Sequence, residues 1–186
     1  MTFARLLATE FLKLKSSFIK PVAALTPLIA GALTFVNFYV RRDYYQELAA
    51  KEGLSAWETL IFQHHFLWYL FLGLVVMVFA FQVLHVEYKS NSWKQALTLP
   101  VSRAKIYAAK WCAVFILSTA MIAANGILLG IMGKLLGFAE PLPVSLLLAY
   151  TGYQIAAISS LISCQGMLSA LVRHPGISLT IGAAGV

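Results

Sequence analysis

Four long runs without any charged residue most constrain what this chain can fold into. The runs cover residues 21–40, 66–86, 111–133 and 142–172. A helix needs about 20 mainly apolar residues to cross the hydrocarbon core of a bilayer, and each run reaches that length. Only 11% of all residues are charged, against roughly 25% in a soluble domain. The sequence therefore predicts an all-α integral membrane protein, a polytopic transmembrane helical bundle.

The last apolar run, 176–186, is too short to cross a bilayer. Its 11 residues rise only about 16 Å as a helix, which is about half of a hydrocarbon core. We therefore expect about five spans in this sequence and a natural chain that continues beyond Val186, so that the sequence is C-terminally truncated. Residues 1–186 form a single transmembrane domain in this interpretation.

Residues 1–20 have the spacing of an amphipathic helix. Apolar side chains recur every three or four residues on one side, and Lys, Arg and hydroxyl side chains occupy the other. Such a helix favours the membrane interface, with its apolar side toward the acyl chains. A plain basic flank of the first span is the alternative. The predicted apolar side consists of Phe3, Leu7, Phe11, Leu14 and Phe18.

The segment after the first span carries charges of both signs and two helix signals. Gly53 is typical of a helix end, and Ser55 with Glu58 fits a capping box at the start of another helix. We expect the first helix to continue from the first span to about Glu52. The second should begin at Ala56 and run back into the membrane.

Lys and Arg are distributed unevenly between the two sets of loops. Ten of them lie in 1–20, in 87–110 and at Arg173, and four lie in the loops on the other side. Short cytoplasmic loops carry an excess of Lys and Arg, so the N-terminus and 87–110 are predicted to be cytoplasmic. Because these cations stand in short loops beside apolar runs, we expect them to face anionic lipid and not nucleic acid.

Patterns for catalysis or metal binding are absent from the sequence. The Gly133-Lys134 pair lacks the spacing of a phosphate-binding loop and the Ser or Thr that should follow. His64, His65 and His85 lack the i, i+4 spacing of helical zinc ligands, and we interpret them as interfacial side chains. We therefore expect no enzyme activity, no metal and no cofactor in this chain.

Polar groups inside the predicted spans are few, and none of them is ionisable. Ion-coupled transporters usually place a carboxylate, His or Arg at mid-membrane, so this composition weakens the prediction of a secondary transporter. Asn125 and Gln154 could hydrogen-bond across helices, which we favour, or contact a substrate. The full set is Asn37, Gln82, Asn125, Gln154 and Gln165.

Small residues are spaced along one side of two predicted spans. In 111–133 and in 142–172 they recur at alternating intervals of three and four residues, which places each set on one helix face. Because lipid tails are as apolar as leucine, membrane helices associate by close contact along such faces. We expect both faces to pack, either on each other or on a second subunit. The principal packing residues are Gly126, Gly130, Gly152, Ala156, Ser159, Ser163 and Gly166.

The interruption at 87–110 has more structure than a simple charged loop requires. Ser92 and Gln95 fit a capping box for a short helix, which Pro100 ends. Ser102 can cap a second helix that runs into the third span. These features are typical of a rigid docking element for a cytoplasmic partner. An interfacial loop with a lipid-anchoring Trp is the alternative, and the residues alone leave both open.

Two stretches resemble the ABC-2-type permeases of ABC transporters. WKQALTLPVSRAKIYAAK at 93–110, preceded by Glu87, is similar to the loop after the second span of that family. ATEFLKLKSS at 8–17 is similar to its opening helix. The resemblance is closest to the branch that serves lantibiotic immunity and bacitracin or antimicrobial-peptide export. The segment between the first two spans is longer and more helical than a minimal permease of this kind needs.

The resemblance implies a six-span permease of a bacterial cell membrane that exports an amphiphilic or peptide substrate. A separate ABC ATP-binding subunit would bind ATP and Mg²⁺, and a second permease, identical or a sister, would complete the transporter. The 87–110 segment would be the coupling helix that receives the motion of the ATPase. A membrane adaptor or immunity protein that acts without ATP-driven transport is the rival hypothesis. The implied coupling residues are Glu87, Trp93, Lys94, Leu97, Pro100, Arg103 and Lys105.

Overall fold

The computed structural model describes residues 2–89 and 101–171. In these ranges the chain is all-helical, as the sequence predicts. The short helix predicted between Ser92 and Pro100 and the last apolar run lie outside the described residues. The elements are α1 (Phe3–Lys13), the 3-10 turn η1 (Leu14–Ser16), α2 (Ile19–Val40), α3 (Arg42–Glu52), α4 (Ala56–Lys89), α6 (Arg103–Leu135) and α7 (Val144–Leu171).

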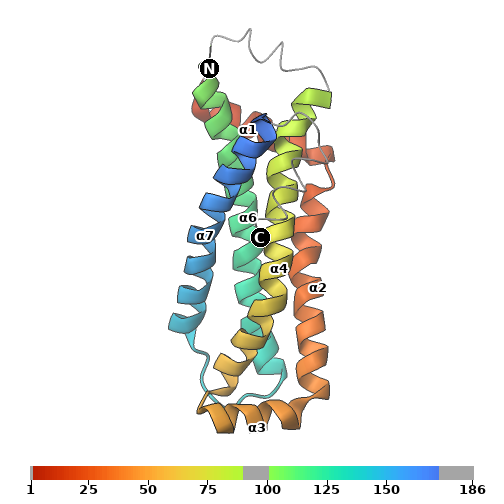
Figure 1. Cartoon of the computed structure of the whole chain (residues 1–186), viewed down its shortest axis with the longest axis vertical. Helices are drawn as coiled ribbons and strands as arrows, with labels where there is room; N and C mark the ends of the chain where they lie inside the picture. Colours follow the sequence, from red (N-terminus) through yellow and green to blue (C-terminus); the bar gives the residue numbers. More distant parts are fainter. Residues whose placement is uncertain (1, 90–100, 172–186) are drawn as a thin grey trace.

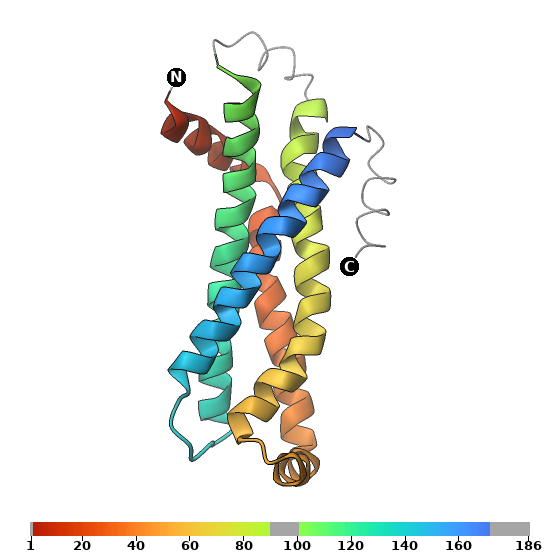
Figure 2. The same ribbon diagram turned by 60° about the vertical axis from the view of Figure 1, so that its left-hand side comes forward.

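Four of these helices, α2, α4, α6 and α7, are long and apolar enough to cross a membrane. They confirm the first four predicted spans and form one elongated bundle (Figures 1 and 2). One end of the bundle carries α1, the last turns of α4 and the first turns of α6, and we call it the α1 end. The opposite end carries α3 and the connection from α6 to α7, and we call it the α3 end (Figure 1).

Two clusters of buried apolar side chains hold the bundle together. The larger one lies between the four long helices, where Trp68, Phe79 and Ile122 are fully buried. The smaller one lies at the α3 end and includes Tyr45 and Trp57, which are 4% and 1% exposed. The α3 end is therefore packed as part of the bundle.

The chain turns sharply between α2 and α3, and the prediction of one helix reaching about Glu52 is wrong. Arg41 leaves the helical region with φ −108° and ψ 34°, and α3 then lies across the end of the bundle (Figure 1). Stacking of Phe38 on Tyr45, with ring centroids 4.4 Å apart, holds this turn. A straight helix would carry Tyr45 away from the bundle, and its buried area would be lost.

The start of α4 confirms the signals that the sequence provides. Gly53 adopts a left-handed conformation with φ 65° and ends α3. The N–H of Ser55 donates to Glu58 Oε2 at 2.8 Å, and the N–H of Glu58 donates to Ser55 Oγ at 3.2 Å, which is a capping box. From there α4 runs for 34 residues, about 51 Å, so it is longer than a hydrocarbon core of about 30 Å.

Helical structure precedes the first span, as the sequence predicts, but it is not one continuous helix over 1–20. Extended backbone at Ser17, with ψ 150°, separates α1 and η1 from α2. Phe3 and Phe18, which the spacing places on the apolar side, are 42% and 50% exposed, as side chains that face acyl chains would be. The carboxylate of Glu10 turns toward the bundle instead, because it binds an ammonium group on α6. The buried side of this region consists of Leu6, Glu10 and Leu14.

Candidate functional site at the α1 end

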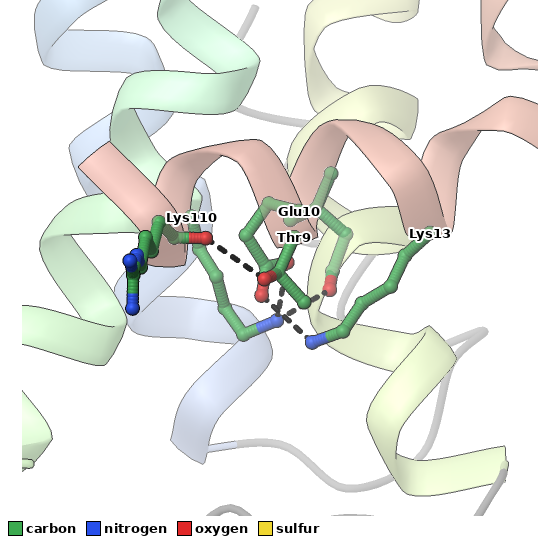
Figure 3. Close-up of polar contacts among 6 residues, drawn as sticks. Thr9, Glu10, Lys13 and Lys110 are labelled. Carbon is green, nitrogen blue, oxygen red and sulfur yellow. Dashed lines mark hydrogen bonds and ion pairs between the residues drawn. The ribbon is translucent and has the colours of Figure 1, made fainter. Parts of the chain in front are cut away.

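A carboxylate and an ammonium group meet inside the bundle at the α1 end. Glu10 Oε2 accepts a hydrogen bond from Lys110 Nζ at 2.9 Å, and Glu10 Oε1 accepts one from Lys13 Nζ at 2.8 Å (Figure 3). Glu10 is 6% exposed and Lys110 is 2% exposed. Taking a single charge this far out of water costs several kcal/mol, so each buried group depends on the other. We call this contact the Glu10–Lys110 pair.

Lys110 also joins the α1 helix to a third element. Its Nζ donates to the backbone carbonyl oxygen of Val83 at 3.2 Å. Val83 belongs to α4 and Lys110 to α6, and these two helices flank residues 90–100 on either side. One amine therefore links the N-terminal helix to both helices that enter and leave the predicted coupling segment.

Helix periodicity explains how both charges reach the interior. Glu10 follows the buried Leu6 by four residues, so both lie on the same side of α1. Lys110 follows the buried Ile106 by four residues and precedes the buried Val114 by four. Each charge thus occupies a position in an otherwise apolar stripe. That interruption is the sequence signal that could have revealed the pair.

The sequence prediction missed this site because its two residues lie far apart in the chain. It counted Lys110 as one more cytoplasmic loop cation, whereas the structure buries it, and it gave Glu10 no role of its own. The two residues are 100 positions apart in the chain. A single sequence shows an interrupted stripe on each helix, but it does not show that the two stripes face each other.

The predicted coupling residues are described only in part. Arg103 and Lys105 are exposed at the start of α6, and Glu87 lies in the last turn of α4. Ser102 stands at the N-cap position with extended backbone, so α6 begins where the sequence predicts, although no bond from this hydroxyl caps it. The coupling roles stay predictions. Outside the described residues lie Trp93, Lys94, Leu97 and Pro100.

Glycines on α6 and α7 allow close contacts between helices. A Cβ atom built on Gly126 would lie 2.8 Å from Thr151 Oγ1, and one on Gly130 would lie 3.5 Å from a leucine side chain of the α7 region. A Cβ on Gly166 would lie 2.6 Å from the hydroxyl of Tyr107. Larger side chains at Gly126 and Gly166 would push the neighbouring helix away.

Most of the small-residue side of α7 points away from the bundle. Gly152 and Ala156 are exposed, and Ser159 is half-buried. Ser163 is exposed too, but its Oγ accepts a hydrogen bond from Trp111 Nε1 of α6 at 3.0 Å. No atom lies within 4 Å of a Cβ built on Gly152. The small-residue faces of α6 and α7 therefore do not pack on each other along their length. The side of α7 that faces the bundle holds instead Gln154, Ile158, Ile162 and Gln165.

Histidine cross-links three helices in the interior, and the interpretation of His64 as an interfacial residue is wrong. Its Nδ1 lies 2.9 Å from Thr34 Oγ1 on α2, and its Nε2 lies 3.0 Å from Asn125 Oδ1 on α6. The side chain is fully buried, because α4 begins at Ala56 and His64 lies two turns inside it. Within residues 2–89 and 101–171, no three His, Cys, Asp or Glu side chains gather as metal ligands would.

A second polar contact joins α4 to α7. Trp68 Nε1 donates to Gln154 Oε1 at 2.8 Å, and both side chains are buried. Together with the contact of Asn125 to His64, it confirms that Asn125 and Gln154 bond across helices. Each bond satisfies polar atoms that lipid could not solvate.

The comparisons place almost the whole chain in one family. The model of the ABC-2 family transporter proteins matches residues 6–183. This range contains Glu10, Lys110 and all four helices that can cross a membrane. The search of curated proteins found no match, and neither did the search of solved structures.

Proposed function

Because the chain belongs to the ABC-2 transporter family, whose members are membrane transport components that work with ABC ATP-binding subunits, we propose that it is the permease subunit of an ABC exporter. A separate ATPase would bind ATP and Mg²⁺. The substrate would be an amphiphile or a peptide, as in antimicrobial-peptide resistance or lantibiotic immunity. A groove of about 730 Å³ lies between α6 and α7, and Lys134 is its only charged lining residue within 2–89 and 101–171, which supports an amphiphilic substrate.

The Glu10–Lys110 pair is the observation that carries the coupling mechanism. Lys110 lies seven residues after Arg103, about 10 Å along α6 from its first turn. A displacement of this turn by a partner would therefore move the amine, and with it α1 and the Val83 carbonyl of α4. Because separating the two buried charges would cost several kcal/mol of free energy, the three helices should move together.

The segment between α4 and α6 would receive the motion of the ATPase. In this mechanism the apolar side chains of Trp93 and Leu97 enter a groove on the ATPase, and Pro100 sets the angle of the short helix. Lys94, Arg103 and Lys105 would surround the contact, and Glu87 would end the second span. The exposure of Arg103 and Lys105 agrees with a place at the rim.

Orientation and assembly complete the proposal. The ten-to-four distribution of Lys and Arg supports a bacterial cell membrane protein whose N-terminus and α1 end face the cytoplasm. Two permeases, identical or sister chains, would stand over two ATPases and alternate in access. The exposed Gly152 and Ala156 of α7 offer a face on which a second permease could approach closely.

Recovery of the ATP-binding subunit tests this proposal. The permease and a candidate ABC ATP-binding subunit are produced together, and this ATPase is recovered on tagged permease of wild-type, Trp93→Ala and Lys94→Ala sequence. A buried aromatic anchor commonly contributes about 2 kcal/mol or more, whereas a rim charge contributes much less. Trp93→Ala should therefore lose most of the ATPase, and Lys94→Ala should retain it.

Transport measurements separate the exporter from its rival. In inverted membrane vesicles the wild-type complex should accumulate an amphiphilic peptide only when ATP is hydrolysed, and Trp93→Ala should abolish this uptake. If Trp93→Ala retains as much ATPase and takes up as much peptide as wild type and Lys94→Ala do, the docking role of the short helix is excluded. Protection against the peptide without any ATP dependence would favour an adaptor or immunity protein.

A further inference from the structure

A cavity lies beneath α3, at the end of the bundle farthest from the coupling segment. It measures about 330 Å³ and is bounded by α3, the start of α4, the end of α2 and the residues that follow α6. Figure 1 shows α3 crossing this end beside the connection from α6 to α7. The role proposed for the coupling segment makes no use of this region, although α3 is an element that a minimal permease does not need.

Aromatic rings form the apolar wall of this cavity. Phe38 stacks on Tyr45 with ring centroids 4.4 Å apart, and Phe138 packs edge-on against Phe38 at 5.8 Å. Trp57 supports Phe138 from behind, with centroids 5.3 Å apart. Because the rings fix one another, the wall exists before any ligand arrives, which lowers the entropy that binding must overcome.

Two tight helix ends hold the walls in place. Gly137 has φ 77°, and the N–H of Phe138 donates back to the carbonyl of Gly133 at 3.2 Å, so the chain folds over the end of α6. At the end of α3, the N–H of Leu54 donates in the same way to the carbonyl of Ala49 at 2.9 Å. The first is a Schellman turn, and at the second the N–H of Gly53 also donates to the carbonyl of Ala49. Phe138 and Ala49 line the cavity.

Arg42 supplies the charge of the cavity. Among the residues that the structure describes, it is the only charged one that lines the cavity, and Gln46, four residues later on α3, lines the same side. No carboxylate of the described residues forms an ion pair with Arg42. A guanidinium presents a planar set of donors that suits carboxylate and phosphate groups. An anion at this site would therefore meet two donors beside an aromatic wall.

We propose that the cavity beneath α3 binds a small anionic amphiphile. Its carboxylate or phosphate contacts Arg42 and Gln46, and its apolar part lies against Phe38, Tyr45 and Phe138. The volume falls at the lower end of the range for small-molecule sites, about 300–1,000 Å³, so the site holds one short chain or one head group. This goes beyond the proposed function, since binding here needs neither the ATPase nor a second permease.

Fluorescence titration of the full chain tests the proposal. The protein is placed in nanodiscs of phosphatidylcholine and titrated with dansylglycine, a carboxylic acid small enough for the cavity, whose emission rises in an apolar site. The matching primary amide, which lacks the charge, is the control probe. Wild type should bind the acid saturably, and Arg42→Gln should weaken that binding about tenfold, the effect of losing one charge-assisted contact. Binding of the amide should be weak and equal in both.

Two further variants test whether binding depends on the position of the arginine and on the volume of the cavity. Arg41→Gln removes the neighbouring arginine, which does not line the cavity, and should bind the acid like wild type. Ala49→Leu adds carbon atoms to the wall of the cavity and should weaken both probes. Elution profiles and helical circular dichroism identify the variants that fold. The proposal fails if wild type does not bind the acid, if both arginine variants behave alike, or if folded Ala49→Leu binds normally.

A competition experiment identifies the source of the anion. Phosphatidylglycerol is added to the nanodiscs at a fixed fraction of the lipid, and the titration with the acid is repeated. If phosphatidylglycerol displaces the acid, and discs of phosphatidylcholine alone show no such displacement, the site binds a membrane phospholipid. Undiminished binding assigns it to a free amphiphile that enters from solution.

Discussion

At Glu10 a carboxylate stands in a stripe of apolar side chains, held by Lys13 and Lys110. Apolar residues of similar volume often stabilise a protein as well as a buried ion pair does, so the charges need not serve stability. They do fix which turn of α1 meets which turn of α6, because no other register pairs them. We therefore expect changes at this site to separate stability from coupling.

A single change at the pair should lower the stability of the protein, and a double change that removes both charges should restore most of it. Glu10→Gln leaves the Lys110 ammonium buried beside a neutral group, which should cost about 3–5 kcal/mol and lower the unfolding temperature in detergent. The double variant Glu10→Leu with Lys110→Met should recover most of that loss. ATP-driven uptake should stay low in both variants, because the register that joins α1 to α6 is gone.

The control for the pair is its more exposed partner. Lys13→Gln removes an ammonium whose side chain is 33% exposed, and surface ion pairs contribute only about 0–1 kcal/mol. Its unfolding temperature and uptake should stay close to wild type. Full uptake by the double variant would show that the pair plays no part in coupling.

His64 and His65 are adjacent in the chain, yet the structure gives them different surroundings. His64 contacts Thr34 and Asn125 in the interior, whereas His65 is exposed beside the rings of Tyr69 and Tyr150. His64→Leu should leave the buried Asn125 Oδ1 without its partner, whereas Thr34 Oγ1 still donates to the carbonyl of Ala30, and it should cost about 1–3 kcal/mol, measured by thermal unfolding in detergent. His65→Leu should lower the unfolding temperature less. Equal losses of stability in the two variants would contradict the cross-link of His64 to Thr34 and Asn125.

At the scale of helices, local signals were readable from the sequence and distant contacts were not. Gly53 and the Ser55–Glu58 capping box placed the start of α4, because all their partners lie within a few residues. The turn at Arg41 was missed, since Phe38 and Tyr45 become neighbours only when Phe138, 100 residues later, completes the cluster. The positions of the spans followed from their uncharged runs, but the face that each one buries did not, and α4 and α6 extend well beyond the runs 66–86 and 111–133.

Two glycines on the small-residue faces should respond differently to substitution. Gly126→Leu places a side chain against Thr151 and should destabilise the single chain by about 1–3 kcal/mol through overpacking. Gly152→Leu meets no atom within 4 Å, so its unfolding temperature in detergent should equal that of wild type.

Substitution of Gly152 should instead affect the assembly of two permeases. If α7 forms the contact between permeases, Gly152→Leu should shift cross-linked dimers to monomers in native membranes, and Ala156→Cys should cross-link two copies. Exposed Leu28, which lies on α2, supplies the control Leu28→Cys, which should not cross-link. Dimers that persist in Gly152→Leu would exclude this face as the interface.

For the whole molecule, the unequal distribution of cations predicts one orientation of the bundle. The family and the four apolar helices establish a multi-pass membrane protein, and α3 lies at the end opposite α1 (Figure 1). In a chain with Cys112 and Cys164 replaced by Ala, Ala50→Cys on α3 should react with an impermeant maleimide in intact cells. Ser102→Cys should react only after the cells are opened. Labelling of both from one side would contradict the orientation.

The separation of Glu10 from Lys110 also sets an order of events during synthesis. The two residues are 100 positions apart, so at about 5–20 residues per second the ribosome makes Lys110 about 5–20 s after Glu10. During that interval two membrane spans can insert, while the carboxylate of Glu10 still lacks its buried partner and must stay hydrated. The first helix made is therefore among the last to reach its final place, once α6 has arrived.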